Sequence, residues 1–421
     1  MQLELFYNLF TECDYKFTTD SRSIPEGSIF FALKGDNFNG NLFAIEALKK
    51  GASYAVVDEK TENDNRLILV DDVLTFMNEL AHFHRKCFDI IVIAIGGSNG
   101  KTTTKNLIVN VLKQKFRAHC TQGNFNNHIG VPITLLQIPI DCEVAIIELG
   151  TNNPGEIAAL CKITAPTHGL ITNIGKEHLE GFGTLEAVAK EESELYHYLL
   201  KNGGLAFVNQ DDDWLTRMSR SIKNTQYYSK KDISIQSIIP SIEISIENEK
   251  IKSTLMGDYN LDNLLAAMAI GHHLGVSNQE IKIGIESYIP GNNRSQWIHN
   301  GSNQILLDAY NANPSSMQVA IENFSKMPNK KQILILGDMF EMGDQAKKEH
   351  LDLLIWAKQF KFESIYLLGE HFNQVSANCS IETYATMEAL GENLKSKNHN
   401  DTAILIKGSR GMKMERVLDY L

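Results

Sequence analysis

The segment at residues 91–105 constrains the fold of this chain more than any other. It runs Ile-Val-Ile-Ala-Ile-Gly-Gly-Ser-Asn-Gly-Lys-Thr-Thr-Thr-Lys, an apolar stretch followed by a glycine-rich turn and a lysine. The β-branched stretch predicts a buried strand, and the apolar spacing over residues 107–112 predicts a helix after the turn. Glycines let consecutive backbone N–H groups face phosphate oxygens, and the N-terminus of the next helix adds partial positive charge. The segment therefore predicts a nucleotide-phosphate loop at the edge of a parallel α/β sheet.

Two side chains of this loop have predicted roles. In such loops the lysine, here Lys101, reaches the β- and γ-phosphates, and the hydroxyl of the next residue, Thr102, holds Mg²⁺. The other loop residues expected to contact ATP are Gly97, Ser98, Asn99, Gly100 and Thr103. The match is imperfect, because Ile95 stands where the general pattern has its first glycine. The alternative is a glycine-rich turn that happens to precede a lysine; the strand before it and the helix after it favour the phosphate interpretation.

Length and composition bound the remaining possibilities. A chain of 421 residues, 43% hydrophobic and 22% charged, predicts a globular protein of two or three domains. Its net charge of −11 argues against a protein that grips the nucleic-acid backbone. The six cysteines lack metal-ligand spacing, no apolar stretch approaches the length of a membrane span, and the first residues show no signal-peptide pattern. We expect a cytoplasmic protein that binds neither nucleic acid nor membrane, and we expect it to be a monomer.

Three α/β units are expected, because apolar strands alternate with helical patterns along the chain. Residues 1–87 form the first, with strands at 28–33, 54–57 and 67–70 and helices at 42–50 and 74–85. Residues 88–293 form the second, with further strands at 144–149, 169–173 and 204–209 and an antiparallel hairpin at 241–256 on the same sheet. Residues 294–421 form the third, after a turn-rich linker at 289–293, with strands at 304–307, 332–336, 364–368 and 403–407 and a helix at 345–359. A phosphate loop in the middle unit suggests a reaction site between domains, whose closure could exclude water.

Candidate metal ligands follow two of the expected strands. Glu148 closes the apolar stretch at 144–147, and His178 follows the strand at 170–173 after a short loop. Mg²⁺ prefers oxygen ligands, so a carboxylate at a strand end beside phosphates suits it, and a histidine is a less usual ligand. A capping or salt-bridging role is the alternative for Glu148. For an isolated His178, a packed or surface imidazole would be the preferred interpretation.

Further motifs extend the pattern, in order, along nearly the whole chain. They are Gly-Ser-Asn-Gly-Lys-Thr at 97–102, Ile-Glu-Leu-Gly at 147–150, Thr-Asn-Ile-Gly at 172–175, His-Leu-Glu-Gly-Phe-Gly at 178–183 and Tyr-Asn-Leu-Asp-Asn at 259–263. In these motifs the chain resembles the ATP-dependent Mur ligases of peptidoglycan synthesis. Four more stretches resemble the family member that joins UDP-N-acetylmuramoyl-tripeptide to D-alanyl-D-alanine, and they lie at 123–132, 308–314, 336–343 and 407–411.

The resemblance implies a fold, a reaction and its partners. A central ATP-binding domain would lie between an N-terminal domain for the UDP-sugar substrate and a C-terminal Rossmann-like domain that closes over ATP and binds the dipeptide. The implied reaction is an amide ligation. The γ-phosphoryl group of ATP would pass to the tripeptide carboxylate, and the amine of D-alanyl-D-alanine would attack the acyl phosphate, giving UDP-MurNAc-pentapeptide, ADP and phosphate. Phosphoryl transfer between anions needs metal ions and lysine to neutralise charge, so ATP and Mg²⁺ are the expected cofactors.

The resemblance also implies roles for individual residues. Lys101, Glu148 and His178 would be catalytic, with Thr102 and Glu148 on a first Mg²⁺ and His178 on a second. On the ATP side it adds Asn260, Asn263, Arg294, Asp308 and Tyr310, and on the substrate side Ser21, Arg22, Lys34, Asn126, Asn127, Lys407, Ser409 and Arg410. Taken alone, the two asparagines of the ATP side could cap a helix, and Asp308 could end a strand. Asn-Gly-Asn at 39–41 departs from the family's usual Asp-Gly-His, which leaves the role of that loop open.

A second departure concerns the metal site. Mur ligases generally carry a lysine, modified by CO₂ to a carbamate, on the helix after the histidine loop, and alignment places Glu192 at that position. Helical periodicity puts Glu192 on an apolar stripe with Val188 and Leu195, and Lys190 on the opposite side. A carboxylate on an apolar stripe is costly unless it is paired or bound to metal. We therefore expect Glu192 to replace the carbamate as a catalytic metal ligand; the alternative is an ordinary salt bridge at Glu192, with Lys190 as the modified residue.

Rival functions share parts of this pattern. Another Mur-type ligase or a folylpolyglutamate synthase would share the ATP machinery but should lack the stretches at 126–132 and 337–343. A nucleotide-binding switch or regulatory ATPase would use the phosphate loop without ligating anything, and the third domain with Asp308, Tyr310 and Lys407 argues against it. No motif reports on the third residue of the tripeptide or on the extent of domain closure.

Overall fold

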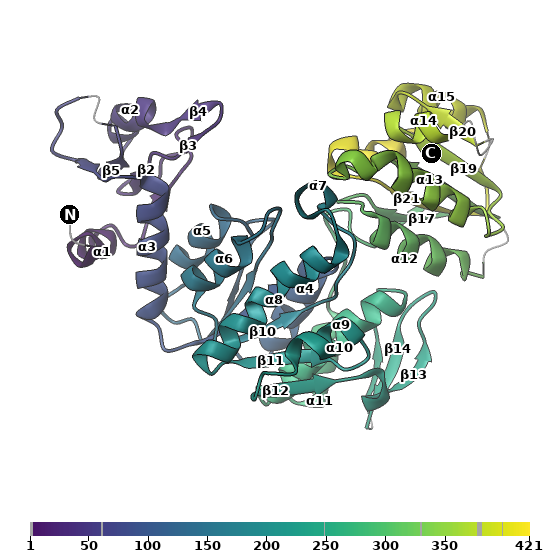
Figure 1. Cartoon of the computed structure of the whole chain (residues 1–421), viewed down its shortest axis with the longest axis horizontal. Helices are drawn as coiled ribbons and strands as arrows, with labels where there is room; N and C mark the ends of the chain where they lie inside the picture. The colour runs from purple at the N-terminus through teal and green to yellow at the C-terminus, as the bar shows by residue number, and fades with distance from the viewer. Residues whose placement is uncertain (1–2, 60–61, 248, 329–330, 377–380, 398) are drawn as a thin grey trace.

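The computed structural model describes residues 3–59, 62–247, 249–328, 331–376, 381–397 and 399–421. They form three α/β domains, with the central one between the other two (Figure 1). None of the helices in these residues is both long enough and apolar enough to cross a membrane. The fold class expected from the sequence is confirmed; the exact boundaries after residues 87 and 293 stay predictions.

The N-terminal domain is built on a four-stranded parallel sheet of order β1-β2-β5-β6. Its strands are β1 (Phe17–Thr18), β2 (Ile29–Phe31), β5 (Tyr54–Val57) and β6 (Leu67–Leu69), with a small ribbon of β3 (Lys34–Gly35) and β4 (Phe38–Asn39). Its helices are α1 (Leu3–Glu12), α2 (Ala44–Lys49) and α3 (Val73–Lys86), and a 3₁₀ turn, η1 (Gly40–Phe43), precedes α2. The apolar face of α3 continues into the core of the central domain, because Met77 and Leu80 belong to the same buried cluster as Val92 and Ile147. The first two domains therefore share one core.

The central domain holds a six-stranded, all-parallel sheet of order β12-β11-β10-β7-β9-β8. The strands are β7 (Ile91–Gly96), β8 (Ala118–Cys120), β9 (Val144–Glu148), β10 (His168–Ile171), β11 (Leu205–Asn209) and β12 (Thr225–Tyr228). The helices are α4 (Lys101–Leu112), α5 (Gly130–Leu136), α6 (Glu156–Thr164), α7 (Leu179–Phe182), α8 (Leu185–Asn202), α9 (Asp213–Ser219), α10 (Asp258–His273) and α11 (Asn278–Glu286). Because β9, β7 and β10 are neighbours, the segments that follow them meet at one edge of the sheet. This edge carries the phosphate loop.

The predicted hairpin forms, but the prediction that it lies on the central sheet is wrong. Strands β13 (Ser234–Ser237), β14 (Glu243–Ile246) and β15 (Glu249–Lys252) make a separate antiparallel sheet. The side chains of Ile244 and Ile251 pack into the cluster beneath α10 and α11. Because these alternating apolar residues are buried against helices, the hairpin has no need to extend the parallel sheet.

The C-terminal domain contains a second six-stranded sheet, of order β16-β17-β21-β18-β19-β20. Its strands are β16 (Gln296–Asn300), β17 (Asn303–Asp308), β18 (Lys331–Gly337), β19 (Ser364–Leu368), β20 (Glu382–Tyr384) and β21 (Thr402–Lys407), all parallel except β16, which the sequence analysis missed. Its helices are α12 (Pro314–Ser325), α13 (Ala346–Ala357), α14 (Glu370–Ser376) and α15 (Met387–Ser396), with short 3₁₀ turns, the first of which, η3 (Gly343–Gln345), precedes α13. The carboxyl ends of β17 and β21 face the central domain, where α7 lies against this domain (Figure 1).

Candidate active site

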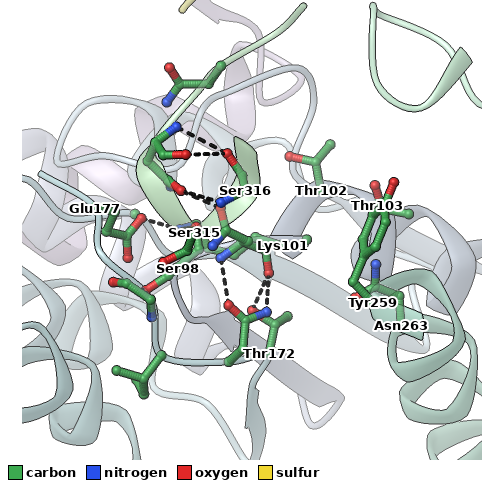
Figure 2. Close-up of a pocket in the computed structure, with 18 of the residues that line it drawn as sticks. Ser98, Lys101, Thr102, Thr103, Thr172, Glu177, Tyr259, Asn263, Ser315 and Ser316 are labelled. Carbon is green, nitrogen blue, oxygen red and sulfur yellow. Dashed lines mark hydrogen bonds and ion pairs between the residues drawn. The ribbon is translucent and has the colours of Figure 1, made fainter. Parts of the chain in front are cut away.

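A cavity of about 810 Å³ opens between the carboxyl edge of the central sheet and the C-terminal domain. Figure 2 shows Lys101 in the middle of it, with Ser98, Thr172 and Glu177 on one side and Tyr259 and Asn263 on the other. Ser315 and Ser316, at the start of α12, reach the same cavity from the C-terminal domain. The cavity is thus shared by two domains, as the sequence predicts.

The phosphate loop has the backbone that its glycines allow. Gly97 and Gly100 have φ of 109° and 82°, in the left-handed region, and Gly100 is the residue before the first turn of α4. Asn173, at the end of the next strand, fixes the loop: its carbonyl oxygen accepts from Ser98 N at 2.9 Å and its Oδ1 from Asn99 N at 3.2 Å. The loop is therefore held in shape by the neighbouring strand end.

The Lys101 ammonium is buried inside this loop. It donates to the carbonyl oxygens of Gly97 and Ser98, and Glu177 Oε2 lies 3.7 Å away. Burial lowers the pKa of Lys101, but the nearby carboxylates of Glu177, Glu192 and Glu148 outweigh burial and raise the pKa above its ordinary value. A positive charge is therefore held where a phosphate would bind.

Two buried carboxylates of this site keep an oxygen without a hydrogen-bond partner among the described residues. Glu148, at the end of β9, accepts through Oε1 from Thr102 Oγ1 at 3.1 Å and from Asn126 Nδ2 at 3.0 Å, while its Oε2 has no such partner. Lys105 Nζ is 3.8 Å from that second oxygen. Glu177 is 5% exposed, and its Oε1 is likewise unpartnered. Buried oxygens of this kind indicate a missing cation or donor, and hard oxygen donors beside a phosphate loop fit Mg²⁺.

His178 joins this group from the loop before α7. Its backbone is left-handed, with φ of 44°, and its ring lines the cavity. Its Nδ1 lies 2.6 Å from Glu341 Oε2 of the C-terminal domain, and its Nε2 lies 3.8 Å from Glu177 Oε2. Burial lowers the pKa of His178, but the hydrogen bond to Glu341 and the charges of both glutamates raise it overall. Glu148, Glu177 and His178 thus surround Lys101.

Glu192 lies behind the phosphate loop rather than in the cavity lining. It is fully buried on α8, and its Oε2 accepts from Gly97 N at 2.7 Å, while Oε1 has no hydrogen-bond partner within the described part of the chain. Burial raises the pKa of Glu192 to about 7, against the lowering effect of Lys101. Lys190 is exposed on the other side of the helix, in agreement with the predicted register. The contact seen here is with the loop backbone, so metal binding by Glu192 stays a prediction.

The residues predicted on the ATP side line the same cavity. Asn260 and Asn263 are buried on α10 and bonded to each other, Nδ2 of Asn263 donating to Oδ1 of Asn260 at 3.2 Å. Thr104 Oγ1 donates to Asn263 Oδ1 at 2.9 Å, which ties this pair to the phosphate-loop helix. The Arg294 guanidinium stacks on the Tyr310 ring at 3.5 Å.

The predicted substrate residues divide into three groups. Asn126, Asn127 and Lys407 line the cavity, and Lys407 Nζ is paired with Asp308 Oδ2 at 2.6 Å. Ser409 does not line it: this buried hydroxyl accepts from Phe340 N at 2.8 Å and so has a structural contact.

The third group is not part of the cavity lining. The Arg410 guanidinium is 5.6 Å from the Tyr310 ring and 3.8 Å from Glu415. Ser21, Arg22 and Lys34 are in the N-terminal domain, where exposed Arg22 pairs with Asp20 at 2.7 Å. Lys34 contacts Asp58 and Glu59, each at 2.8 Å. For all of the predicted substrate residues, contact with substrate stays a prediction.

Several site residues were missed in the sequence. Glu177 stands beside the predicted His178, and its position next to that residue was the available signal. Glu341 lies inside the quoted stretch 336–343, but nothing in the sequence indicates that it meets His178. Asn173 was quoted in a motif without a role. Lys105 follows the phosphate loop by one helical turn, which places it on the same face as Lys101.

Fold and site together define a nucleotide-binding enzyme whose phosphate loop faces a second α/β domain. Three family models match the chain: "Mur ligase family, catalytic domain" at residues 15–85, "Mur ligase middle domain" at 95–271 and "Mur ligase, glutamate ligase domain" at 293–410. The chain belongs to the Mur ligase family.

Its relatives narrow the resemblance to one branch of the family. The UDP-N-acetylmuramoyl-tripeptide--D-alanyl-D-alanine ligases of Bacillus subtilis and Escherichia coli are 32% and 33% identical to it, over 96% of this chain and 92% and 93% of theirs. A crystal structure of MurF from Acinetobacter baumannii matches with a TM-score of 0.88 at 29% identity, covering 96% of this chain and 92% of that one. MurF ligase from Thermotoga maritima, in complex with ADP, matches with a TM-score of 0.84 at 27% identity, covering 96% of both chains. The chain is thus a Mur ligase most like MurF.

Proposed function

We propose that this chain is an ATP-dependent ligase that adds D-alanyl-D-alanine to UDP-N-acetylmuramoyl-tripeptide, giving UDP-MurNAc-pentapeptide, ADP and phosphate. The relatives that carry this activity in their names match over nearly their full length. The observation that carries the proposal is the shared cavity, where the phosphate loop of one domain faces Asp308, Lys407 and Ser315 of another. A ligase needs such a place, because ATP and two further substrates must meet there.

The first step is activation of the tripeptide carboxylate. A carboxylate is a poor electrophile, and transfer of the γ-phosphoryl group to its oxygen creates a leaving group, so that the incoming amine expels phosphate. Lys101 stabilises the charge on the transferring group, since its ammonium is buried and positively charged at the loop. Closure of the C-terminal domain over the cavity keeps water from the acyl phosphate.

Thr102, Glu148, Glu177 and His178 are the residues that would hold Mg²⁺. Bound there, Mg²⁺ would neutralise phosphate charge and align the donor and acceptor oxygens. Glu148 and Glu177 suit this role because each keeps one buried oxygen unpartnered by other described residues. Glu192 would contribute its carboxylate to the second metal site in place of a carbamate.

The Glu192 assignment has its own test. Activity that is unchanged after exhaustive CO₂ removal, and lost in Glu192→Ala but not in Lys190→Ala, supports it. Activity that depends on CO₂ and is lost in Lys190→Ala would assign the carbamate to Lys190 instead.

The N-terminal domain is proposed to take the UDP-sugar portion, with Ser21, Arg22 and Lys34 as its contacts. Lys34 and Arg22 are suited to phosphate groups because both are exposed cations, now paired with carboxylates that a phosphate could replace. We further propose that the protein acts in the cytoplasm as a monomer.

Phosphate release tests the proposed function directly. ATP and Mg²⁺ are supplied with UDP-MurNAc-tripeptide alone, with D-alanyl-D-alanine alone and with both. The mass of the nucleotide product is then measured by mass spectrometry. Strong release only with both substrates, together with a UDP-MurNAc-pentapeptide mass, is the expected result. Release that is indifferent to either substrate would refute the ligase and favour a phosphate-loop ATPase.

A further inference from the structure

The contact between His178 and Glu341 joins two domains at the edge of the cavity. His178 belongs to the central domain and lines the cavity, whereas Glu341 follows β18 of the C-terminal domain. The 2.6 Å separation between His178 Nδ1 and Glu341 Oε2 is that of a strong, charge-assisted hydrogen bond. Glu341 is not among the described residues that line the cavity, and its carboxylate reaches the site through its contact with the histidine.

Both residues are held in an unusual backbone conformation. The φ angles of His178 and Glu341 are 44° and 63°, in the left-handed region that residues with a Cβ rarely adopt. Such conformations persist where the surrounding structure enforces them, and they concentrate at functional sites. Here a backbone bond from Glu180 N to Glu341 O, at 3.1 Å, locks the two loops together.

Other contacts across the same boundary support this arrangement. Gln345 Nε2 donates to Gly183 O at 2.8 Å. On the other side of His178, Lys176 N donates to Ser315 Oγ at 2.9 Å, and Lys176 Nζ pairs with the buried Glu349 at 2.7 Å. The loop at residues 176–183, which carries His178, thus makes hydrogen bonds to the C-terminal domain at both of its ends.

The bond to Glu341 decides which nitrogen of His178 is available. A carboxylate only accepts hydrogen bonds, so Nδ1 must carry a proton, and in the neutral ring the lone pair is then on Nε2. This second nitrogen lies on the side of Glu177, at 3.8 Å from its Oε2. A metal-binding histidine typically has its other ring nitrogen fixed by a carboxylate in this way.

We propose that Glu341 is a positioning residue, which fixes the tautomer and orientation of His178 so that Nε2 is presented to a divalent cation only when the C-terminal domain is docked. The inference rests on the proposed function in taking His178 as a metal ligand. It makes domain docking a condition for completing the metal site, and it assigns to the C-terminal domain a residue of that site which does not touch substrate.

The test uses the full-length protein and two readouts. The first is the tautomer of His178 in the metal-free protein, from the ¹⁵N chemical shifts of histidine-labelled protein, with the signal assigned by its loss in His178→Gln. The second is Mn²⁺ affinity in the presence of ADP, measured by electron paramagnetic resonance. The variants are Glu341→Ala, Glu341→Gln and, as a matched control on the same loop, the exposed Asp344→Asn.

At an alkaline pH that keeps the ring neutral, we expect the Nδ1–H tautomer in the unmodified protein and a mixture of tautomers in Glu341→Ala. Mn²⁺ affinity should fall about 10- to 100-fold in Glu341→Ala, the usual cost of losing such a partner. Glu341→Gln should keep most of both signals, because its amide oxygen still accepts from Nδ1–H, and Asp344→Asn should change neither.

Two outcomes would overturn the proposal, and they are distinguishable. A single Nδ1–H tautomer retained in Glu341→Ala would remove the positioning role and leave the proposed function intact. Mixed tautomers in Glu341→Ala with unchanged Mn²⁺ affinity, and equally unchanged affinity in His178→Gln, would remove His178 as a metal ligand and so refute that part of the proposed function.

Discussion

The two domains on either side of the cavity differ in how the charged side chains at the ends of their sheets are paired. On the central side, Glu148 and Glu177 each leave one buried oxygen without a hydrogen-bond partner among the described residues. On the C-terminal side, Lys407 Nζ and Asp308 Oδ2 lie 2.6 Å apart, and Asp308 also accepts from Ser295 N at 3.1 Å. The central domain thus keeps unpartnered carboxylate oxygens at the cavity, whereas the charged groups of the C-terminal domain pair with each other.

The difference indicates a division of labour. Buried polar atoms without partners cost free energy in the folded state, and a protein retains them where a ligand supplies the missing partner. The buried Lys407 ammonium, paired with Asp308, instead fixes the ends of two strands of the C-terminal sheet relative to each other. The central domain therefore carries charged groups that a ligand could complete, whereas the charged pair of the C-terminal domain is already satisfied within the protein.

Of the changes considered, loss of Lys101 should have the largest effect, because it alters the charge of the central side of the cavity. Lys101→Ala removes the buried cation that faces the unpartnered carboxylates, so kcat should fall about 1000-fold, the upper range for losing one group that stabilises transition-state charge. Phosphate release with both substrates present is the measurement. Lys113→Ala, an exposed residue just after α4, serves as the control and should keep full activity.

Breaking the ion pair between Lys407 and Asp308 should destabilise the C-terminal domain. In Asp308→Ala the buried Lys407 ammonium loses its counter-charge and keeps the hydrogen bond to Asn311 O, which should cost about 3 kcal/mol in the free energy of unfolding. Denaturant unfolding gives this value. The double variant Asp308→Ala/Lys407→Met should recover most of this loss, since no buried charge remains. An equal loss in both variants would show that the buried Lys407 charge is not the source of the cost.

Glu192 predicts a pH dependence on the central side. Its pKa in the folded protein, about 7, lies above its ordinary value of 4.5, because burial disfavours the charged form. A raised carboxyl pKa gives the folded state stability that is present below pH 4.5 and is lost as pH rises through 7. Glu192→Gln stays neutral at every pH. The melting temperature of the variant, relative to that of the unmodified protein, should therefore rise between pH 5 and pH 8. A difference that does not vary with pH would contradict this assignment.

The smallest effect is expected at the contact between Arg294 and Tyr310, within the C-terminal domain. The guanidinium lies 3.5 Å from the ring centroid, and such a partly exposed contact contributes about 1 kcal/mol. Tyr310→Leu should therefore raise the KM for ATP about fivefold, whereas Tyr310→Phe, which keeps the ring, should leave it nearly unchanged. Equal effects in both variants would point to the hydroxyl instead of the stacking.

Much of the fold was predictable because its signals are local. The apolar run before Gly96 and the apolar helix face after Lys101 placed β7 and α4 correctly, and alternation of strands and helices predicted parallel sheets. The hairpin around Ile244 was predicted but attached to the wrong sheet, and the edge strands β8, β12, β16 and β20 were missed. These errors concern which surface or neighbouring strand a segment packs against, and that depends on distant elements rather than on the segment's own residues.

The site divides in the same way. Lys101, Thr102 and Glu148 were identified from residue type and position at strand ends, and they come together in the structure. Ser409 shares a motif with Lys407, yet it does not line the cavity, because its hydroxyl accepts a hydrogen bond from the backbone at Phe340 instead.

The sequence by itself determined the phosphate loop, the strands that carry its ligands and the family, since each depends on short stretches with fixed spacing. Only the tertiary structure decided that Glu177 approaches Lys101, that Glu192 supports Gly97 from behind, and that Glu341 meets His178. These contacts join residues on separate loops, helices or domains. They arise from packing of the whole chain, which no local pattern encodes.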